Sequence, residues 1–206
     1  MGEKISVEQH FVGRDGALTE FNRLLSYHRQ KNALYIDWST RLGAEVIWQL
    51  SSRAGIVMRG IDQIIFVSTT GLATPSIDSR LVNVLGLSPQ IVRTPVWGLG
   101  CAGGAAGLAL AWRLAKAEPD AVIALVAVEL CAPTFHFADF SKSNFIATAL
   151  FADGAAGVLV CGDDRARDLQ ISGPEIFAAG TTTWPGSLDV MGWNFDSVGM
   201  QVVFSQ

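Results

Sequence analysis

The sequence predicts an α/β fold in which parallel strands alternate with helices. Residues 64–68 form a short β-branched run and residues 121–128 a continuously apolar one, as in strands that are buried on both faces. Between them lie a further strand near Val96, a glycine-rich turn and an apolar helix over residues 108–117. Strands that are joined through helices in this way lie parallel in one sheet. The chain has 206 residues, enough for one sizeable domain or for one half of a two-part enzyme.

Composition limits the partners and the environment that we expect. Half of the residues are hydrophobic and 17% are charged, which indicates elements buried on both faces or a surface that meets a partner. The net charge is −4 without a basic block, which argues against nucleic acid as a partner. We find no secretory signal and no apolar run that could span a bilayer. The three cysteines lack the spacing of a zinc site or a disulfide scaffold, so we expect a reducing cytoplasm and no metal.

The first half of the chain contains helical patterns on both sides of the first strand. Residues 17–50 have apolar side chains at helical spacing, which indicates two helices separated around Asn32. A shorter helix is expected over residues 77–85, between an N-cap and a glycine that ends it, Ser76 and Gly86. Residues 90–96 include Pro95 and polar side chains, so we expect a poor buried strand there.

The second half is expected to contain further short elements. They are a helix at 143–150, a strand at 155–162 with an inert Cys161, a charged turn at 165–168, a strand at 169–178, and a hairpin of 191–193 with 199–204. Four phenylalanines also fall within a short span of the chain: Phe137, Phe140, Phe145 and Phe151. Such a cluster forms either part of the core or the wall of an apolar substrate cavity.

Cys101 stands where the glycine-rich turn enters the apolar helix. Because that helix is so apolar, we expect its first turn to lie in the interior, with unpaired backbone N–H groups near Cys101. Those groups and the helix dipole favour a thiolate at such a position. Residues 68–70, 98–101 and 129–134 all follow strands, and the carboxyl ends of parallel strands meet at one edge of a sheet. A nucleophilic cysteine at that edge is our first hypothesis.

Two other interpretations of this segment stay open. A cysteine beside glycines is often small packing filler. Residues 98–103 also match the G-x-G-x-x-G pattern of dinucleotide-binding domains, with Glu129 at the end of the next strand as the ribose-binding acid.

Four motifs in one order resemble the type III polyketide synthases, the chalcone synthase-like family of thiolase fold. They lie at residues 67–78, 98–104, 149–156 and 191–193, and their wording is most similar to bacterial alkylpyrone and alkylresorcinol synthases. The resemblance implies that residues 1–206 are mostly the N-terminal half of that fold, a mixed sheet with a buried central helix that contains the cysteine. The C-terminal half is then expected to be absent.

The resemblance also implies roles for individual residues. Cys101 matches the nucleophile that accepts the starter acyl group from coenzyme A. Phe151 matches the gatekeeper between the coenzyme A tunnel and the reaction cavity, and Glu129 matches a buried acid near the active site. The remaining matches are to cavity and tunnel walls, Cys131 and Thr134 for the cavity and Gly192 and Trp193 for the tunnel.

By the same resemblance, the substrates are a fatty acyl-CoA and malonyl-CoA, the products are alkylpyrones or alkylresorcinols, and the protein is a homodimer without a cofactor or metal. The family also uses a His and an Asn of its second half. The three histidines of this sequence, His10, His28 and His136, do not match that His. We therefore expect a fragment with little or no condensation activity. A non-catalytic homologue, or one part of a split enzyme that a partner chain completes, is the alternative.

Overall fold

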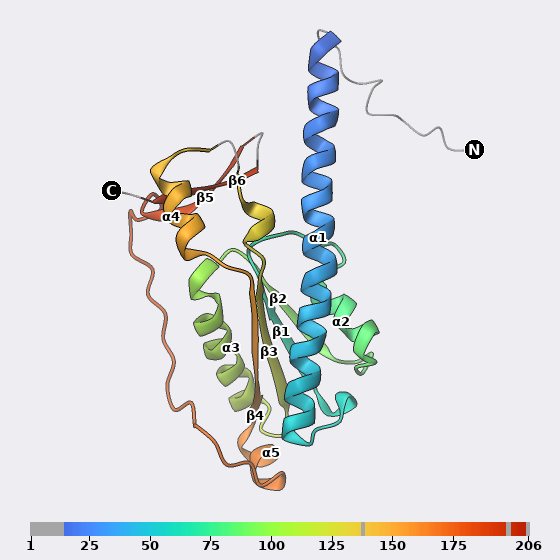
Figure 1. Cartoon of the computed structure of the whole chain (residues 1–206). Helices are drawn as coiled ribbons and strands as arrows, with labels where there is room; N and C mark the ends of the chain where they lie inside the picture. The colour runs from blue at the N-terminus through green and yellow to red at the C-terminus, as the bar shows by residue number, and fades with distance from the viewer. Residues whose placement is uncertain (1–14, 137–138, 197–198, 205–206) are drawn as a thin grey trace, which may run out of the picture.

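A four-stranded mixed sheet forms the centre of the computed structural model, which describes residues 15–136, 139–196 and 199–204. The strand order is β2-β1-β3-β4, with bounds Gln63–Val67 for β1, Val92–Val96 for β2, Val122–Glu129 for β3 and Gly154–Cys161 for β4. β1 pairs in parallel with both β2 and β3, while β4 runs antiparallel to β3 (Figure 1). The parallel β-α-β core and the mixed sheet expected above are both confirmed.

The place of each strand follows from its side chains. All five residues of β1 are buried, and so are the first five residues of β3, because helices cover both faces of these central strands. β2 is an edge strand with exposed Val92, Arg93 and Pro95. The strand expected near Val96 is confirmed, and its exposed residues agree with the expectation that 90–96 is poorly suited to a buried strand. Proline cannot donate to a ladder, and the edge position tolerates that loss.

One face of the sheet is covered by α1 (Asp15–Ala54) and α2 (Ile77–Leu85). The two helices predicted around Asn32 are wrong, because α1 is continuous through this residue. The Asn32 amide bonds outside the helix: its Nδ2 donates to Leu72 O at 2.9 Å, and its Oδ1 accepts from Leu72 N at 3.0 Å. Asn32 therefore anchors the loop after β1 instead of ending the helix.

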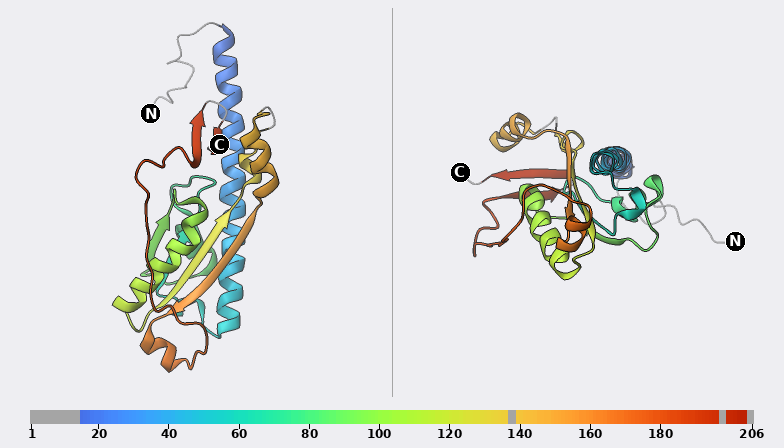
Figure 2. Two further views of the ribbon diagram at one scale, coloured as in Figure 1. Left: turned by 90° about the vertical axis from the view of Figure 1, so that its left-hand side faces the viewer. Right: turned by 90° about the horizontal axis from the view of Figure 1, so that it is seen from below.

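The opposite face of the sheet is covered by α3 (Gly103–Ala117), as the two further views also show (Figure 2). Its Ala111 and Ala115 pack with Ile65, Ile123 and Leu125 in a second core cluster. The other side of α3 is open, with Leu108 at 38% exposure. Within this chain the helix is therefore buried on one side only.

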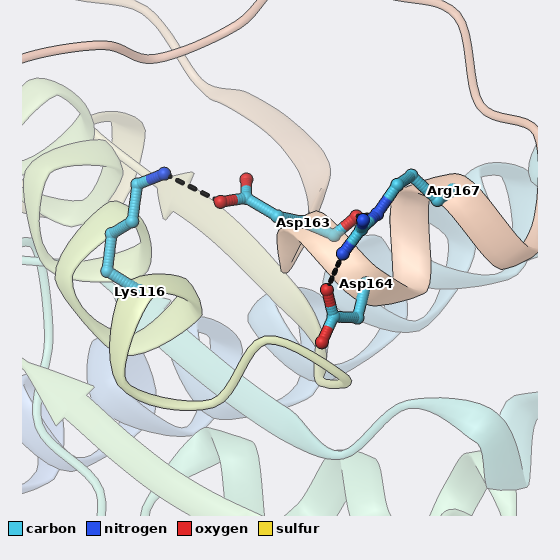
Figure 3. A network of polar contacts seen from close by, with 4 residues as sticks. All are labelled: Lys116, Asp163, Asp164 and Arg167. Carbon is cyan, nitrogen blue, oxygen red and sulfur yellow. Dashed lines mark hydrogen bonds and ion pairs between the residues drawn. The ribbon is translucent and has the colours of Figure 1, made fainter.

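Short elements complete the chain: a 3₁₀ turn at Met58–Gly60, α4 (Lys142–Leu150), α5 (Asp163–Asp168), and the β5–β6 hairpin of Met191–Asp196 with Gly199–Phe204. The hairpin is confirmed, and the predicted charged turn is the short helix α5. Figure 3 shows Lys116 of α3 bound to Asp163 of α5 at 2.8 Å, beside an Arg167–Asp164 pair within α5. No helix of the described chain combines the length and the apolar composition needed to cross a membrane.

Two expectations for the second half are wrong. Residues 169–178 form no strand but run along the surface, and Phe177 among them is 87% exposed. Phe140 and Phe145 are 94% and 79% exposed. Phe145 belongs to α4, whose small Ala147 is buried instead. Both phenylalanines therefore belong to no core, whereas Phe151 is half-buried and Phe137 lies outside the described residues.

Candidate active site

Cys101 lies in a 3₁₀ turn, Gly100–Ala102, immediately before the first residue of α3. Gly98 and Gly100 have φ values of +86° and +50°, a left-handed conformation that glycine adopts without strain. These two glycines turn the chain from the end of β2 into α3. The side chain of Cys101 is exposed, so the expectation that this turn lies in the interior is wrong for the described chain. The expectation that the sulfur sits at a helix start is confirmed.

Glu129, the last residue of β3, binds the loop that follows β1. Its Oε1 accepts from Thr69 N at 2.9 Å, and its Oε2 accepts from Thr70 N at 3.1 Å and from Thr70 Oγ1 at 2.8 Å. The Thr70 hydroxyl in turn accepts from Leu130 N at 2.8 Å. A carboxylate that receives several N–H and O–H donors holds them firmly, so the ends of β1 and β3 are fixed against each other.

Thr69 extends this network to the cysteine turn. Its Oγ1 accepts a hydrogen bond from Gly100 N, the residue before Cys101, at 3.1 Å. Glu129 therefore helps to position Cys101 through Thr69. The predicted meeting of three strand ends is confirmed, but sequence reasoning missed the part played by the two threonines. The carboxylate is engaged within the protein, which does not support Glu129 as a ribose ligand of a dinucleotide.

Four of the five residues singled out in the sequence line one open cavity of about 620 Å³: Cys101, Glu129, Cys131 and Phe151. Thr134 is not among its lining residues. Thr134 lines an adjoining cavity of about 490 Å³. Both cavities are lined by Cys131, Phe151 and Trp193. Gly192 also lines the larger cavity.

Phe151 stands in the wall between the two cavities and is held by aromatic neighbours. Its ring centroid lies 6.0 Å from that of Trp193 and 6.1 Å from that of Phe204, both on the β5–β6 hairpin. Tilted aromatic pairs at such distances are stabilising. The hairpin therefore closes one side of the site and fixes the place of Phe151.

The other two cysteines are held in the thiol form. Burial, with the nearby charges of Glu129, Asp153 and Cys101, raises the pKa of the Cys131 thiol to about 11. Burial also raises the pKa of the Cys161 thiol. Because the thiolate is the nucleophilic form, both side chains are poor nucleophiles at neutral pH.

Histidine does not line the cavity of Cys101 in the part of the chain that the structure describes. His136 lines a smaller hollow beside Thr70 and Pro133. The position of His10 and the side chain of His28 lie outside the described parts. Among described residues, no group of three or more His, Cys, Asp and Glu side chains is placed to hold a metal ion.

The chain is similar to proteins of one known family. Residues 27–164 match the family described as chalcone and stilbene synthases, N-terminal domain. A Bacillus subtilis (strain 168) protein with a provisional chalcone synthase name is 42% identical over 185 residues, covering 86% of this chain and 50% of the relative. The 1,3,6,8-tetrahydroxynaphthalene synthase of Streptomyces peucetius subsp. caesius is 36% identical, and the alignment covers 84% of this chain and 46% of that synthase.

Solved structures agree with the sequence relatives. The 1,3,6,8-tetrahydroxynaphthalene synthase of Streptomyces coelicolor A3(2), a bacterial type III polyketide synthase, superposes with a TM-score of 0.79 at 25% identity, over 87% of this chain and 50% of that one. Germicidin synthase from Streptomyces coelicolor, a type III polyketide synthase, gives a TM-score of 0.77 at 26% identity, over 86% and 45%. The chain thus spans about half the length of the curated relatives that it matches.

Proposed function

The chain belongs to the chalcone and stilbene synthase family, whose N-terminal domain it contains, and we propose that its Cys101 accepts the acyl group in a type III polyketide synthase. The observation that supports this most strongly is the position of Cys101. The sulfur is exposed at the start of α3 and borders a cavity of about 620 Å³. That volume lies within the range of small-molecule sites, about 300–1,000 Å³.

The proposed reaction step is an acyl transfer without oxidation or reduction. The Cys101 thiolate attacks the thioester carbonyl carbon of an acyl-CoA, and a tetrahedral intermediate forms. The bond from that carbon to the coenzyme A sulfur then breaks, and the departing thiolate takes up the proton that Cys101 released. The dipole of α3 stabilises negative charge at the helix start, where both the thiolate and the oxyanion develop.

The rim of the cavity favours an apolar starter. Four large apolar side chains line it and are between 46% and 70% exposed: Trp97, Leu99, Leu150 and Phe195. An alkyl chain would cover such side chains and remove apolar surface from water. We therefore propose a fatty acyl-CoA starter and malonyl-CoA as extender, with alkylpyrones or alkylresorcinols as products. Phe151, Cys131 and Thr134 are proposed to shape the path of the chain.

We propose that extension of the acyl chain needs hydrogen-bond donors that the described site does not supply. Decarboxylation of malonyl-CoA calls for donors that stabilise the enolate, for which the resemblance names a His and an Asn of the second half. We propose that residues 1–206 alone load an acyl group without extending it. A partner chain that contributes those groups is the second candidate, and the exposed apolar rim of the cavity favours it.

Assembly and location follow from the resemblance and the cysteines. We propose a cytoplasmic homodimer that uses coenzyme A thioesters as substrates and needs no metal or further cofactor. All three cysteines are free thiols in the structure, as a reducing compartment would keep them.

The test is the intact mass of the protein after incubation with a long-chain acyl-CoA. We expect one acyl adduct on the wild type, none on Cys101→Ala, and an unchanged adduct on Cys131→Ala and Cys161→Ala, which serve as matched controls. Circular dichroism checks that each variant is folded. An adduct that persists in Cys101→Ala would contradict the proposal. Addition of malonyl-CoA is expected to leave the adduct mass unchanged, and growth of the adduct would refute the limit to loading.

A further inference from the structure

The outer side of α1 bears a regular stripe of exposed side chains. Every fourth residue from Tyr35 to Ser51 is buried against the rest of the protein. On the opposite side of the helix, the spacing alternates between four and three residues and every member is exposed: Leu34, Trp38, Arg41, Glu45, Trp48 and Ser52. We call this set the outer stripe. Residues at alternating spacings of four and three lie along one face of an α-helix.

Three of the six members of the outer stripe are large apolar side chains. Leu34, Trp38 and Trp48 are 51%, 48% and 55% exposed. In the view from below in Figure 2, α1 lies at the outside of its layer, and no other helix or strand of the described residues covers its far side. Exposed tryptophans aligned on one helix face are typical of an interaction surface.

The order of the outer stripe is complementary to itself. In an antiparallel pair of identical helices that cross at residue 43, positions equally far from residue 43 face each other. Trp38 then faces Trp48 of the second copy, and Arg41 faces Glu45 of the second copy. Because the pair is symmetric, each of these contacts occurs twice. The charges and the aromatic side chains match in this register.

The charged side chains are already ordered for such a contact. The Arg41 guanidinium donates to Asp37 Oδ1 at 3.0 Å and lies 5.4 Å from the centre of the Trp38 ring. Glu45 Oε1 accepts a hydrogen bond from the neutral Gln49 amide at 2.7 Å. Side chains that are held in place lose less conformational freedom on binding.

From these observations we propose that the outer stripe of α1 binds the same stripe of a second copy of this chain, antiparallel and centred on residue 43. The inference rests on α1 alone and is independent of the acyl chemistry. Where the chain also pairs through another face, this contact joins such pairs into larger assemblies.

The experiment is charge reversal followed by sedimentation velocity of the full chain. Arg41→Glu places two glutamates opposite each other, and Glu45→Arg places two arginines together. Each variant alone is expected to weaken the association by about tenfold or more, because like charges then meet twice. An equimolar mixture of the two variants restores opposite charges at both contacts, and so does the double variant. Both are expected to recover the wild-type mass distribution.

The matched control is Arg53→Glu, which reverses an exposed charge on α1 outside the stripe and is expected to leave association unchanged. Circular dichroism verifies that all chains keep their helix content. The proposal is overturned if the wild type does not associate, if the single variants associate as the wild type does, or if the mixture fails to recover. If the wild type does not associate, the outer stripe would belong to a different partner.

Discussion

Gly107 lies where α3 packs closely on the sheet, and Gly107→Ala tests this packing. A Cβ at this position would lie 2.6 Å from Leu125 Cδ1 and 3.3 Å from Val67 Cγ2, where ordinary contacts begin at 3.4 Å. Leu125 is only 4% exposed, so its side chain has little room to move away. Overpacking of this kind costs about 1–3 kcal/mol. Alanine regains about 1 kcal/mol of helix propensity.

The net expectation for Gly107→Ala is a loss of up to about 2 kcal/mol in the free energy of unfolding. Gly104→Ala is the matched control, because its Cβ would meet nothing within 4 Å. That variant is expected to gain up to about 1 kcal/mol from helix propensity alone. Urea denaturation of the two variants beside the wild type measures both values. A Gly107→Ala protein as stable as Gly104→Ala would refute the close packing of α3 on β1 and β3.

Three further variants test the site and its surroundings. Glu129→Gln replaces an acceptor with a donor beside the Thr69 and Thr70 N–H groups, so urea denaturation is expected to show a loss of about 2 kcal/mol; unchanged stability would contradict the network. In Cys101→Ala, alkylation of Cys131 is expected to accelerate as the pH approaches its pKa of about 11, and a rate that levels off near pH 9 would refute the raised pKa. Lys116→Ala removes an exposed ion pair with Asp163 that solvent screens, so calorimetry should show an unchanged Tm, and a clear fall would show that α5 depends on it.

The two central strands, β1 and β3, could be predicted because they are short and largely apolar, and α2 because Ser76 and Gly86 bound it. The structure gives α2 the predicted range, although the Ser76 side chain makes no capping hydrogen bond. The continuity of α1 could not be predicted, since the amide of Asn32 pairs with a loop forty residues further on. Local patterns also failed at 169–178, where apolar residues find no strand to pair with.

The site was predicted in outline for a topological reason. Parallel strands end at one edge, so Cys101 and Glu129 had to lie near each other. The link between them depends on Thr69, and a hydroxyl that bonds across to the next strand end leaves no periodic signal in the sequence. The resemblance to type III polyketide synthases is confirmed by the comparisons. The residue roles, substrates and products that it implies remain predictions.

The most direct measurement is the position of the acyl group after a long-chain acyl-CoA has reacted with the wild-type chain, read by peptide mapping and tandem mass spectrometry. Our account predicts that the label lies on the peptide of Cys101, on its sulfur, at neutral pH. A label on Cys131 or Cys161, or a folded protein that takes up no label, would contradict it.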